Sequence, residues 1–289
     1  MEYVILNPSS QRSLLQCVKG KMSCTWKALA QKLGIHRSTL FFYLRCETHM
    51  PILTYQKLAN IARWKEKIRT FSMQNQPTKP IFSGKLNAKL AEFIGILAGD
   101  GHLGLRGEID ISGDKDLDSH YFHEYLPALY KQLFNLCPYH VIQQNCIHCR
   151  SNSRILVRKL HARFEIPIGQ KLHNLKIPCE IKQQASFLKA YLRGLFDTDG
   201  CVYQHHKNLA ALEYSSGDPS FLKEISAALS SLNFHPSMGQ DAVRIYKKKE
   251  IVKFFKVIKP ANKKHTFKFE AFSRTGSVPS KKELLKNRR

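Results

Sequence analysis

The sequence has few acidic residues, and its cysteines follow no regular spacing. Its 289 residues include 22 Asp and Glu against 46 Lys and Arg, which gives a net charge of +24 and an isoelectric point near 9.8. An acid deficit of this size in a folded chain indicates a polyanionic partner. Nucleic acid is the leading candidate, and an anionic membrane surface is the alternative.

Long apolar runs are also absent. No stretch of the sequence approaches the roughly 20 residues of a membrane-spanning helix. The first residues, MEYVILNPSSQRSLL, lack the basic start, apolar region and small-residue cleavage site of a signal peptide. With 43% hydrophobic and 24% charged residues, the chain should still bury proper cores. We expect a soluble, intracellular protein of the cytoplasm or nucleoid, with an organelle as a further option.

The eight cysteines do not form the frame of a disulfide scaffold. They are scattered along the chain, which is typical of reduced thiols in a reducing compartment. Cys137, His140, Cys146 and Cys149 do have the ligand types and pair spacings of a small zinc site. The alternative is a strand and turn over residues 141–150 in which these side chains happen to be close.

Charge is distributed unevenly along the chain. Residues 1–80 hold 13 basic and 3 acidic residues, a net charge of +10, and residues 240–289 hold 16 and 4, a net charge of +12. The middle, residues 81–239, has a net charge of only +2. Both ends are therefore expected to face phosphates. The polar, proline-containing stretch 72–85 is interpreted as a linker, and we place a domain boundary there.

The first domain, residues 1–80, contains a helix-turn-helix pattern. Apolar residues recur at helical spacing within residues 25–44, and Gly34 interrupts the first helix before a second begins near Arg37. A third helix is expected over residues 54–62. The pattern resembles phage-repressor-type helix-turn-helix domains, which implies a small all-α domain whose second helix enters the major groove. The alternative is a helical bundle with solvated charges. The candidate DNA contacts are Arg37, Ser38, Thr39 and Arg45.

Two similar nonapeptides divide the rest of the chain. FIGILAGDG (93–101) and LRGLFDTDG (192–200) each end an apolar helix in Asp-Gly, and Asp100 and Asp199 are 99 residues apart. An acid at this place is unfavourable, because the C-terminal end of a helix carries partial negative charge and favours cations. The repetition of this feature predicts a duplicated subdomain with a cation between the two acids.

Further landmarks recur in the same order. A Ser-Gly-Asp element follows each nonapeptide, at 112–114 and 216–218, and precedes an amphipathic helix, at 121–134 and 219–232. KLHNLK and KKHTFK then parallel each other. We therefore expect two subdomains and a disordered basic tail, with these bounds: 86–185, 186–278 and 279–289.

Alternating apolar and polar residues predict antiparallel strands between the helices. These segments are 105–113, 154–160, 208–216 and 242–248. In the first, we expect Leu105, Ile109 and Ile111 to face the core. Each repeat would then run helix, hairpin, helix, hairpin, helix, and the polar faces of the hairpins would form one saddle. The candidate DNA contacts on this saddle are Arg106, Glu108, Asp110, Arg158, Arg244 and Tyr246.

Small residues on the two motif helices predict close packing between them. Gly95 and Gly99 are four residues apart, as are Gly194 and Thr198, so each helix has a small-residue stripe. Such packing would bring the two acidic helix ends together. Neighbouring carboxylates repel and raise each other's proton affinity unless a cation lies between them. Mg²⁺, with Mn²⁺ as the alternative, fits because it binds carboxylate oxygens, waters and substrate phosphates.

These features together resemble the LAGLIDADG homing endonucleases in their single-chain, two-motif form. The resemblance covers residues 86 to about 275 and includes the phrases GQKLHNLKIP and FLKAYLRGLFDTDGCVY. It implies an α+β fold in which two pseudo-symmetric αββαββα subdomains form an eight-stranded, DNA-binding saddle. The first motif has Ala98 where the family motif has its earlier Asp. Its counterpart Asp197 is therefore interpreted as a helix-end or lysine-pairing residue rather than a catalyst.

The resemblance implies a monomeric DNA endonuclease that acts in intron homing, either free-standing or intron-encoded. It would cut both strands of double-stranded DNA by Mg²⁺-dependent hydrolysis, with Asp100 and Asp199 as metal ligands and catalytic residues. Lys171 and Lys263 would lie near the scissile phosphates, with Lys264 as the nearest rival. Two alternatives stay open: a DNA-binding regulator of the same fold without nuclease activity, and an RNA maturase that binds intron RNA.

Overall fold

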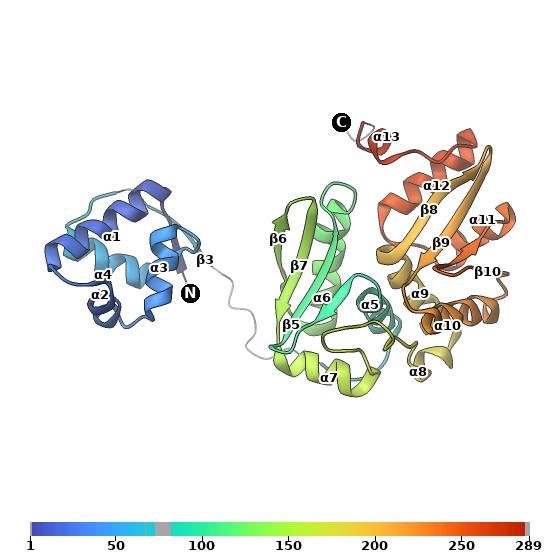
Figure 1. The fold of residues 1–289 in the computed structure, drawn as a ribbon, viewed down its shortest axis with the longest axis horizontal. Helices are drawn as coiled ribbons and strands as arrows, with labels where there is room; N and C mark the ends of the chain where they lie inside the picture. Colours follow the sequence, from blue (N-terminus) through green and yellow to red (C-terminus); the bar gives the residue numbers. More distant parts are fainter. Residues whose placement is uncertain (1, 67, 73–81, 287–289) are drawn as a thin grey trace. The chain divides into compact units, whose positions relative to one another are not determined.

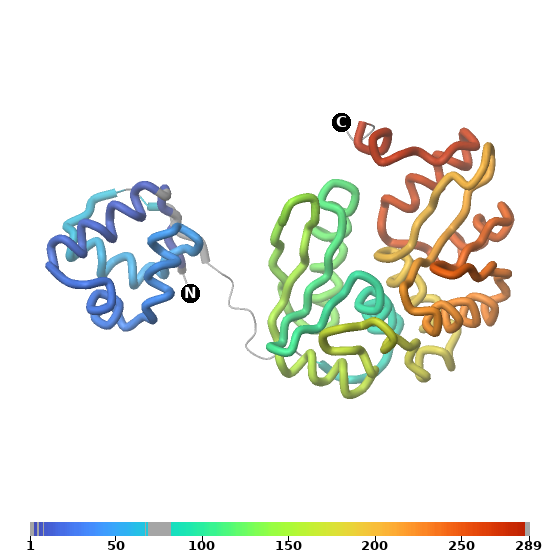
Figure 2. Tube along the Cα trace, in the orientation of Figure 1, coloured from blue at the N-terminus to red at the C-terminus, as the bar shows by residue number. Residues whose placement is uncertain are grey.

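The structure is a computed structural model that describes residues 2–66, 68–72 and 82–286. The chain divides into two compact units, Met1–Thr78 and Lys79–Arg289, and each unit has its own hydrophobic core (Figures 1 and 2). Of the expected linker over 72–85, residues 73–81 lie outside the described residues. Within the described ranges, no helix is long and apolar enough to span a membrane.

The N-terminal unit combines helices with a small antiparallel sheet of strand order β2-β1-β3. The expectation of an all-α domain is therefore wrong in this respect. Strands of two to four residues are too short to show an alternating pattern, so no periodicity in the sequence marks them. The elements are β1 (Glu2–Ile5), α1 (Pro8–Met22), α2 (Trp26–Leu33), α3 (Arg37–Arg45), β2 (Met50–Pro51), α4 (Ile52–Ala62) and β3 (Arg69–Ser72).

Helices α2 and α3 are joined by a tight turn at Gly34. The Thr25 side chain accepts a hydrogen bond from the Ala28 amide at 3.2 Å and begins α2. Gly34 ends α2 in the left-handed region, with φ of 68°, which glycine adopts without strain. Leu29 of α2 and Leu40 of α3 are fully buried in the core of this unit. The local geometry is thus a helix, a turn and a second helix.

The C-terminal unit contains the same αββαββα arrangement twice. The strand orders are β4-β5-β7-β6 in the first sheet and β10-β11-β9-β8 in the second, and both sheets are antiparallel. β4, β5, β7 and β6 thus correspond to β8, β9, β11 and β10. The first repeat comprises α5 (Ala88–Ala98), β4 (Gly101–Leu103), β5 (Glu108–Asp114), the π-helix η1 (Tyr121–Tyr125), α6 (Leu126–Phe134), β6 (Tyr139–Gln143), β7 (Cys146–Asn152), α7 (Arg154–Phe164) and the short α8 (Cys179–Lys182).

The second repeat follows directly and is longer at its C-terminal end. It comprises α9 (Ala185–Asp199), β8 (Gly200–His206), β9 (Leu209–Ser215), α10 (Pro219–Ser231), β10 (Ser237–Met238), β11 (Ala242–Ile245), α11 (Lys248–Val257), α12 (Lys263–Thr275) and α13 (Lys281–Lys286). The α+β class expected from the sequence is confirmed.

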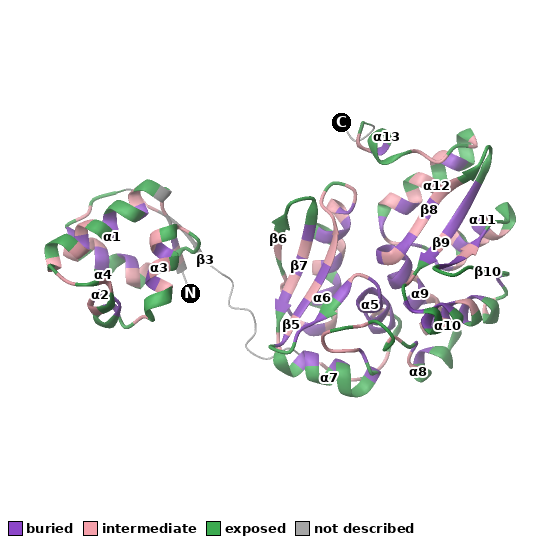
Figure 3. Ribbon diagram, in the orientation of Figure 1, coloured by how far each residue is buried: buried purple, intermediate pink, exposed green. Residues whose placement is uncertain are grey.

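One hydrophobic core runs through both repeats. It includes α5 and α9 and the inner faces of the two sheets, where Ile109 and Ile111 of β5 and Leu212 and Tyr214 of β9 are buried. Figure 3 shows α5 as a mainly buried helix, whereas α7 and α11 carry exposed residues on one side. The opposite faces of both sheets hold polar side chains, as the alternating pattern predicts.

Two strand predictions in the first repeat are wrong. Residues 154–160 form helix α7 instead of a strand, because the Ser153 side chain caps the Leu156 amide at 3.2 Å and every buried residue follows helical spacing. Leu105 lies in the turn before β5 and is 88% exposed, so it does not face the core. The second hairpin is made by β6 and β7 over residues 139–152.

The expectation of a disordered tail is also wrong for the part that the structure describes. Residues Lys281–Lys286 form helix α13, and Leu284 is only 8% exposed. Lys281 forms an ion pair with Asp114 at the end of β5. The tail is therefore held against the first repeat, and the basic residues 287–289 lie outside the described residues.

Candidate metal and catalytic site

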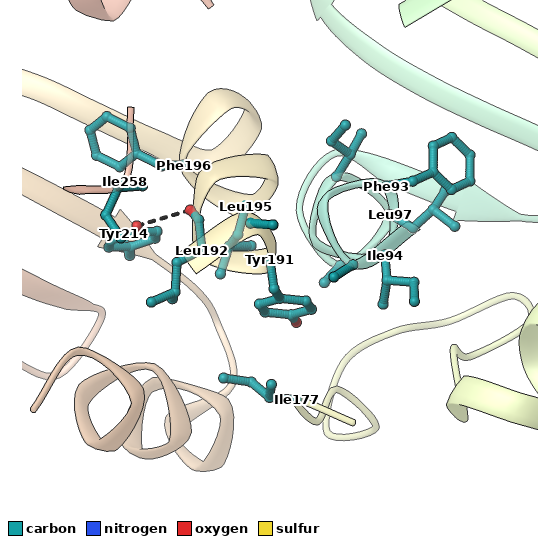
Figure 4. Packing of buried hydrophobic residues seen from close by; sticks show 14 of the residues in the cluster. Phe93, Ile94, Leu97, Ile177, Tyr191, Leu192, Leu195, Phe196, Tyr214 and Ile258 are labelled. Carbon is teal, nitrogen blue, oxygen red and sulfur yellow. Dashed lines mark hydrogen bonds between the residues drawn. The ribbon is translucent and has the colours of Figure 1, made fainter. Parts of the chain in front are cut away.

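The site is built on the contact between α5 and α9. A Cβ atom on Gly95 would lie 2.1 Å from the Tyr191 carbonyl oxygen, and one on Gly194 would lie 2.1 Å from the Glu92 carbonyl oxygen. Any side chain at either position would clash with backbone, so the helices touch through their main chains. Figure 4 shows α5 and α9 side by side with Tyr191 between them, and Phe196 on the far side of α9. The contact is reciprocal, as the small-residue stripes predict.

This packing places two carboxylates together. Asp100 lies two residues after the end of α5, and Asp199 is the last residue of α9. Close approach continues to this end, since a Cβ atom on Gly99 would lie 2.1 Å from Thr198 Oγ1. A Cβ atom on Gly99 would also lie 3.4 Å from Cγ of Asp199, so the two acids are neighbours, and each affects the pKa of the other. Without a cation, two carboxylates this close favour a shared proton.

Burial makes both acids hold protons more tightly than usual. Burial raises the pKa of Asp100, and the charges of Lys264 and Lys171 oppose this rise. Burial, followed by the charge of Asp100, raises the pKa of Asp199 to about 8. The pair is therefore a concentrated set of hard oxygen donors in a partly buried place, which suits a divalent cation.

Lys171 lies beside this pair at the C-terminal end of α5. Its Nζ donates to the carbonyl oxygens of Leu97 and Ala98, each at 3.3 Å, and to that of Gly99. It thus satisfies carbonyls that the last helical turn leaves free and offsets the negative helix end. Burial lowers the pKa of Lys171, while the nearby charge of Asp199 works against that shift.

The second lysine at the pair is Lys264, whereas the predicted Lys263 lies elsewhere. Lys263 is exposed, with its Nζ 2.6 Å from Nε2 of His120. Lys264 Nζ lies 3.0 Å from Oδ1 of Asp118, and its charge acts on both acids of the pair. Adjacent positions on a helix point about 100° apart, so only one of the two lysines can face the pair. The sequence offered no signal to choose between them.

Asp197 fixes the start of α12 and therefore the position of Lys264. It is 1% exposed and accepts hydrogen bonds from the amides of Ala261 and Asn262, both at 3.0 Å. Asn262 Nδ2 donates to Asp118 Oδ1 at 2.7 Å and to the Asp197 carbonyl at 3.0 Å. Burial raises the pKa of Asp197 to about 8. Asp197 pairs with backbone rather than with a lysine, and Asp118 and Asn262 were missed from the sequence.

The predicted saddle contacts occupy different places. Asp110 and Arg244 lie on the outer faces of their sheets, each in an ion pair. Arg158 is exposed on α7 and not on a strand, so its assignment to the saddle is wrong. The other three are Glu108 at the start of β5, Arg106 in the exposed turn before it and Tyr246 just after β11.

The predicted contacts of the N-terminal unit all lie on α3. Arg37, Ser38 and Arg45 are exposed, and Thr39 is half-buried. Arg45 donates through Nε to Glu47 Oε1 at 2.7 Å, so its charge is already paired. Arg37 is therefore the stronger candidate for contact with a phosphate or a base.

Three residues of the cysteine and histidine group, His140, Cys146 and Cys149, lie on the hairpin of β6 and β7 and form no metal cluster among the described residues. Strands β6 and β7 pair His140 with Cys149, and His140 Nε2 lies 2.8 Å from the Phe122 carbonyl oxygen. Burial raises the pKa of Cys149 to about 12, so its thiol stays protonated. In the described part of the chain, no three His, Cys, Asp or Glu side chains gather as a metal site. Cys137 and Cys146 therefore belong to no such group in the described part of the chain.

Comparison with known proteins gives a family match for the second repeat. Residues 186–259 match the LAGLIDADG-like domain. This range runs from α9 to the end of α11 and includes Asp199. No curated protein matches the chain.

Several solved structures are similar at low identity. Mesophilic variants of the homing endonuclease I-DmoI are 14% identical over 59% of this chain and 94% of theirs, with a TM-score of 0.44. I-DmoI in complex with DNA and Mn is 14% identical over 59% of this chain and 96% of its own, with a TM-score of 0.43. Full-length DUF199/WhiA from Thermatoga maritima is 16% identical over 72% of this chain and 66% of its own, with a TM-score of 0.44.

Proposed function

We propose that the chain is a site-specific DNA endonuclease that hydrolyses both strands with a divalent cation held by Asp100 and Asp199. The observation that carries this proposal is the close approach of α5 and α9 at their C-terminal ends, which places these two carboxylates side by side. The helix ends disfavour acids, and burial disfavours their charge. A divalent cation between the two carboxylates would offset both costs.

The donor set fits Mg²⁺ or Mn²⁺, because both prefer carboxylate oxygens and keep positions for water and phosphate. The chemistry that such an ion supplies is polarisation of a phosphodiester and activation of water. Asp100 and Asp199 would hold the ion at the C-terminal ends of α5 and α9. No nucleophilic side chain is needed for this hydrolysis.

Lys171 and Lys264 would act on the phosphate. Both have their ammonium groups close enough to the acid pair to affect the proton affinity of Asp100. A cation held in place by surrounding groups stabilises the negative charge that develops on a phosphate during hydrolysis. Lys171 is held by the end of α5 and Lys264 by Asp118. We therefore assign these two lysines, rather than Lys263, to the two scissile phosphates.

The N-terminal unit would supply further DNA affinity through a helix-turn-helix element. A turn at Gly34 joins α2 to α3, and Arg37 and Ser38 are exposed on α3. Residues 1–80 also carry a net charge of +10, which favours binding to phosphates. In this proposal residues 1–80 bind DNA, while the subdomains 86–185 and 186–278 each bind one half of the recognition site. The protein would act as a monomer, since one chain holds both acids.

The test is cleavage of a plasmid that carries the two genomic sequences flanking the gene. In this plasmid the two sequences are joined directly, as they are in a genome that lacks the gene. Linear product is expected with Mg²⁺ or Mn²⁺ and none with EDTA. Asp100→Asn and Asp199→Asn should each lower the rate by a factor on the order of 1,000, with DNA binding retained. Asp116→Asn, a change at an exposed acid outside the pair, is the matched control and should cut at the normal rate.

Two results would contradict the proposal. Cleavage that survives both substitutions would remove the acid pair from the mechanism. Tight, sequence-specific binding with no cleavage under either metal would instead favour a DNA-binding regulator, a function that the α2–α3 element and the net charge of +24 also suit.

A further inference from the structure

The two sheets carry the same arginine and carboxylate pair at corresponding places. In the first repeat Arg150 of β7 lies opposite Asp110 of β5, and in the second Arg244 of β11 lies opposite Glu213 of β9. β5 and β9 are corresponding strands, as are β7 and β11. The pairs therefore occupy equivalent positions, although the identity of the acid differs.

Both pairs lie on the outer, polar face of their sheet. On β7, the residues on either side of Arg150, which are Cys149 and Ser151, are buried. On β11, the residues on either side of Arg244 are also buried and face the core. The arginine side chains remain partly exposed, at 28% for Arg150 and 22% for Arg244. Arg150 also lines an open hollow of about 300 Å³ on this face, together with His102 and Tyr139. A base edge thus has room to approach.

The same atom of each arginine is occupied. Arg150 Nε donates to Asp110 Oδ2 at 2.8 Å, and Arg244 Nε donates to Glu213 Oε2 at 2.6 Å. The Nη end of Arg150 makes only a 3.4 Å contact with His148. The Nη2 of Arg244 donates to Asp241 at 3.2 Å, Tyr203 also hydrogen-bonds this guanidinium, and its Nη1 packs against Gly239. Asp110 thus fixes Arg150 at Nε and leaves its far end for an outside acceptor, whereas the far end of Arg244 is already engaged within the protein.

The chemistry of the pair favours a base over a phosphate. A carboxylate beside an arginine cancels much of its attraction for an anion, but it does not weaken hydrogen bonds to a neutral acceptor pair in the same way. Guanine presents such a pair in the major groove, O6 and N7, and arginine binds both in a bidentate fork. An arginine fixed at Nε is already oriented for that contact and loses little further side-chain freedom.

We infer that Arg150 reads one guanine, in the half of the DNA site that the first repeat contacts. The inference rests on the proposed function, because it needs DNA on the outer face of the first sheet. Asp110 is the positioning residue that holds Arg150 for this contact.

The experiment is selection from a pool of short DNA duplexes with a randomised centre. Binding is scored with Ca²⁺ in place of Mg²⁺, and bound duplexes are sequenced for the wild type and for Arg150→Ala, Arg150→Lys and Arg244→Ala. The wild type should require guanine at one position in one half of the site. Arg150→Ala should lose this preference by about 5- to 150-fold, the usual range for a bidentate contact, whereas Arg244→Ala should keep it.

Arg150→Lys keeps the charge but not the fork, so it should retain most of the overall affinity and still lose the guanine preference. Asp110→Asn should weaken the same preference while leaving the other half-site unchanged. Arg158→Ala, a change to an exposed arginine on α7, is the matched control and should leave the selected sequence unaltered.

The outcomes separate this inference from the proposed function. If the wild type selects a sequence and Arg150→Ala loses affinity evenly for all duplexes, Arg150 contacts phosphates and the inference is wrong. A guanine preference that survives in Arg150→Lys would also overturn it. If the wild type selects no sequence at all, the proposed function itself fails.

Discussion

In the first repeat Lys171 donates to the last carbonyls of α5, whereas in the second repeat Lys264 is paired with the carboxylate of Asp118. Both lysines lie near the same two acids, yet one is held by neutral backbone and the other by a buried charge. Elsewhere the repeats agree closely, as in the reciprocal contacts of Gly95 and Gly194. Duplication thus kept the helix packing and the acid pair but changed the support of the lysines.

This difference has an energetic consequence. Removing a lysine from carbonyl oxygens leaves polar groups that water can still reach in a half-buried place. Removing a lysine from a buried carboxylate leaves an uncompensated charge, which costs far more. Asp118 is 3% exposed and has only Asn262 and the Asp114 amide as further hydrogen-bond donors among the described residues. The second repeat should therefore depend on its lysine for stability as well as for chemistry.

The largest effect is expected where the repeats are most alike. Gly95→Ala and Gly194→Ala should each lower the free energy of unfolding of the C-terminal unit by about 3–5 kcal/mol, because the new methyl group meets backbone at 2.1 Å. The reciprocal geometry predicts similar losses for both. Urea unfolding followed by circular dichroism measures them, and a loss at only one of the two glycines would contradict the symmetry.

Gly20→Ala is the matched control for this pair of changes. Gly20 lies in helix α1 and a Cβ there meets nothing within 4 Å, so alanine should stabilise the N-terminal unit by about 0.5–1 kcal/mol. The two tryptophans, Trp26 and Trp64, both lie in that unit, so their fluorescence reports its unfolding separately. The glycine changes in α5 and α9 should leave the fluorescence transition in place.

The next effect should differ between the repeats. Lys264→Met should destabilise the C-terminal unit by about 3 kcal/mol and Lys171→Met by about 1 kcal/mol, since only the first strands a buried carboxylate. Each should slow cleavage of one DNA strand by about 100-fold, which the ratio of nicked to linear plasmid measures. Lys263→Met is the matched control, with stability within about 0.5 kcal/mol of the wild type.

A double variant separates stability from chemistry. Asp118→Asn combined with Lys264→Met removes the stranded charge, so it should recover most of the lost stability without recovering cleavage. If cleavage returns with stability, Lys264 acts only by supporting the fold.

The sequence was sufficient for features that depend on repetition and insufficient for those that depend on side-chain direction. The two Asp-Gly helix ends and the small-residue stripes correctly predicted the paired helices. Helices can approach to backbone contact only where glycine leaves no side chain between them. Helix α7 was mistaken for a strand because its Ser153 cap was not recognised among alternating apolar and basic residues. The choice of Lys264 over Lys263 depends on Asp197 and Asn262, whose contacts join residues 64 and 144 positions apart. No local pattern encodes such contacts.

The smallest effect concerns the N-terminal unit, where two arginines of α3 differ in the same way as the two lysines. Arg45 is already paired with Glu47, whereas no acidic partner holds the exposed Arg37 among the described ion pairs. Arg37→Ala should weaken DNA binding by about 1 kcal/mol and reduce the slope of log affinity against log salt by about 1. Arg45→Ala should change the affinity and the salt slope less, because its charge is partly cancelled before DNA binds.

Fluorescence anisotropy over a salt series measures the affinity and the salt slope. The cut position should not change, because the acid pair of the C-terminal unit sets it. Equal losses for the two arginines would show that the pairing with Glu47 does not persist in solution, and a shifted cut position would mean that α3 sets the register of the whole complex.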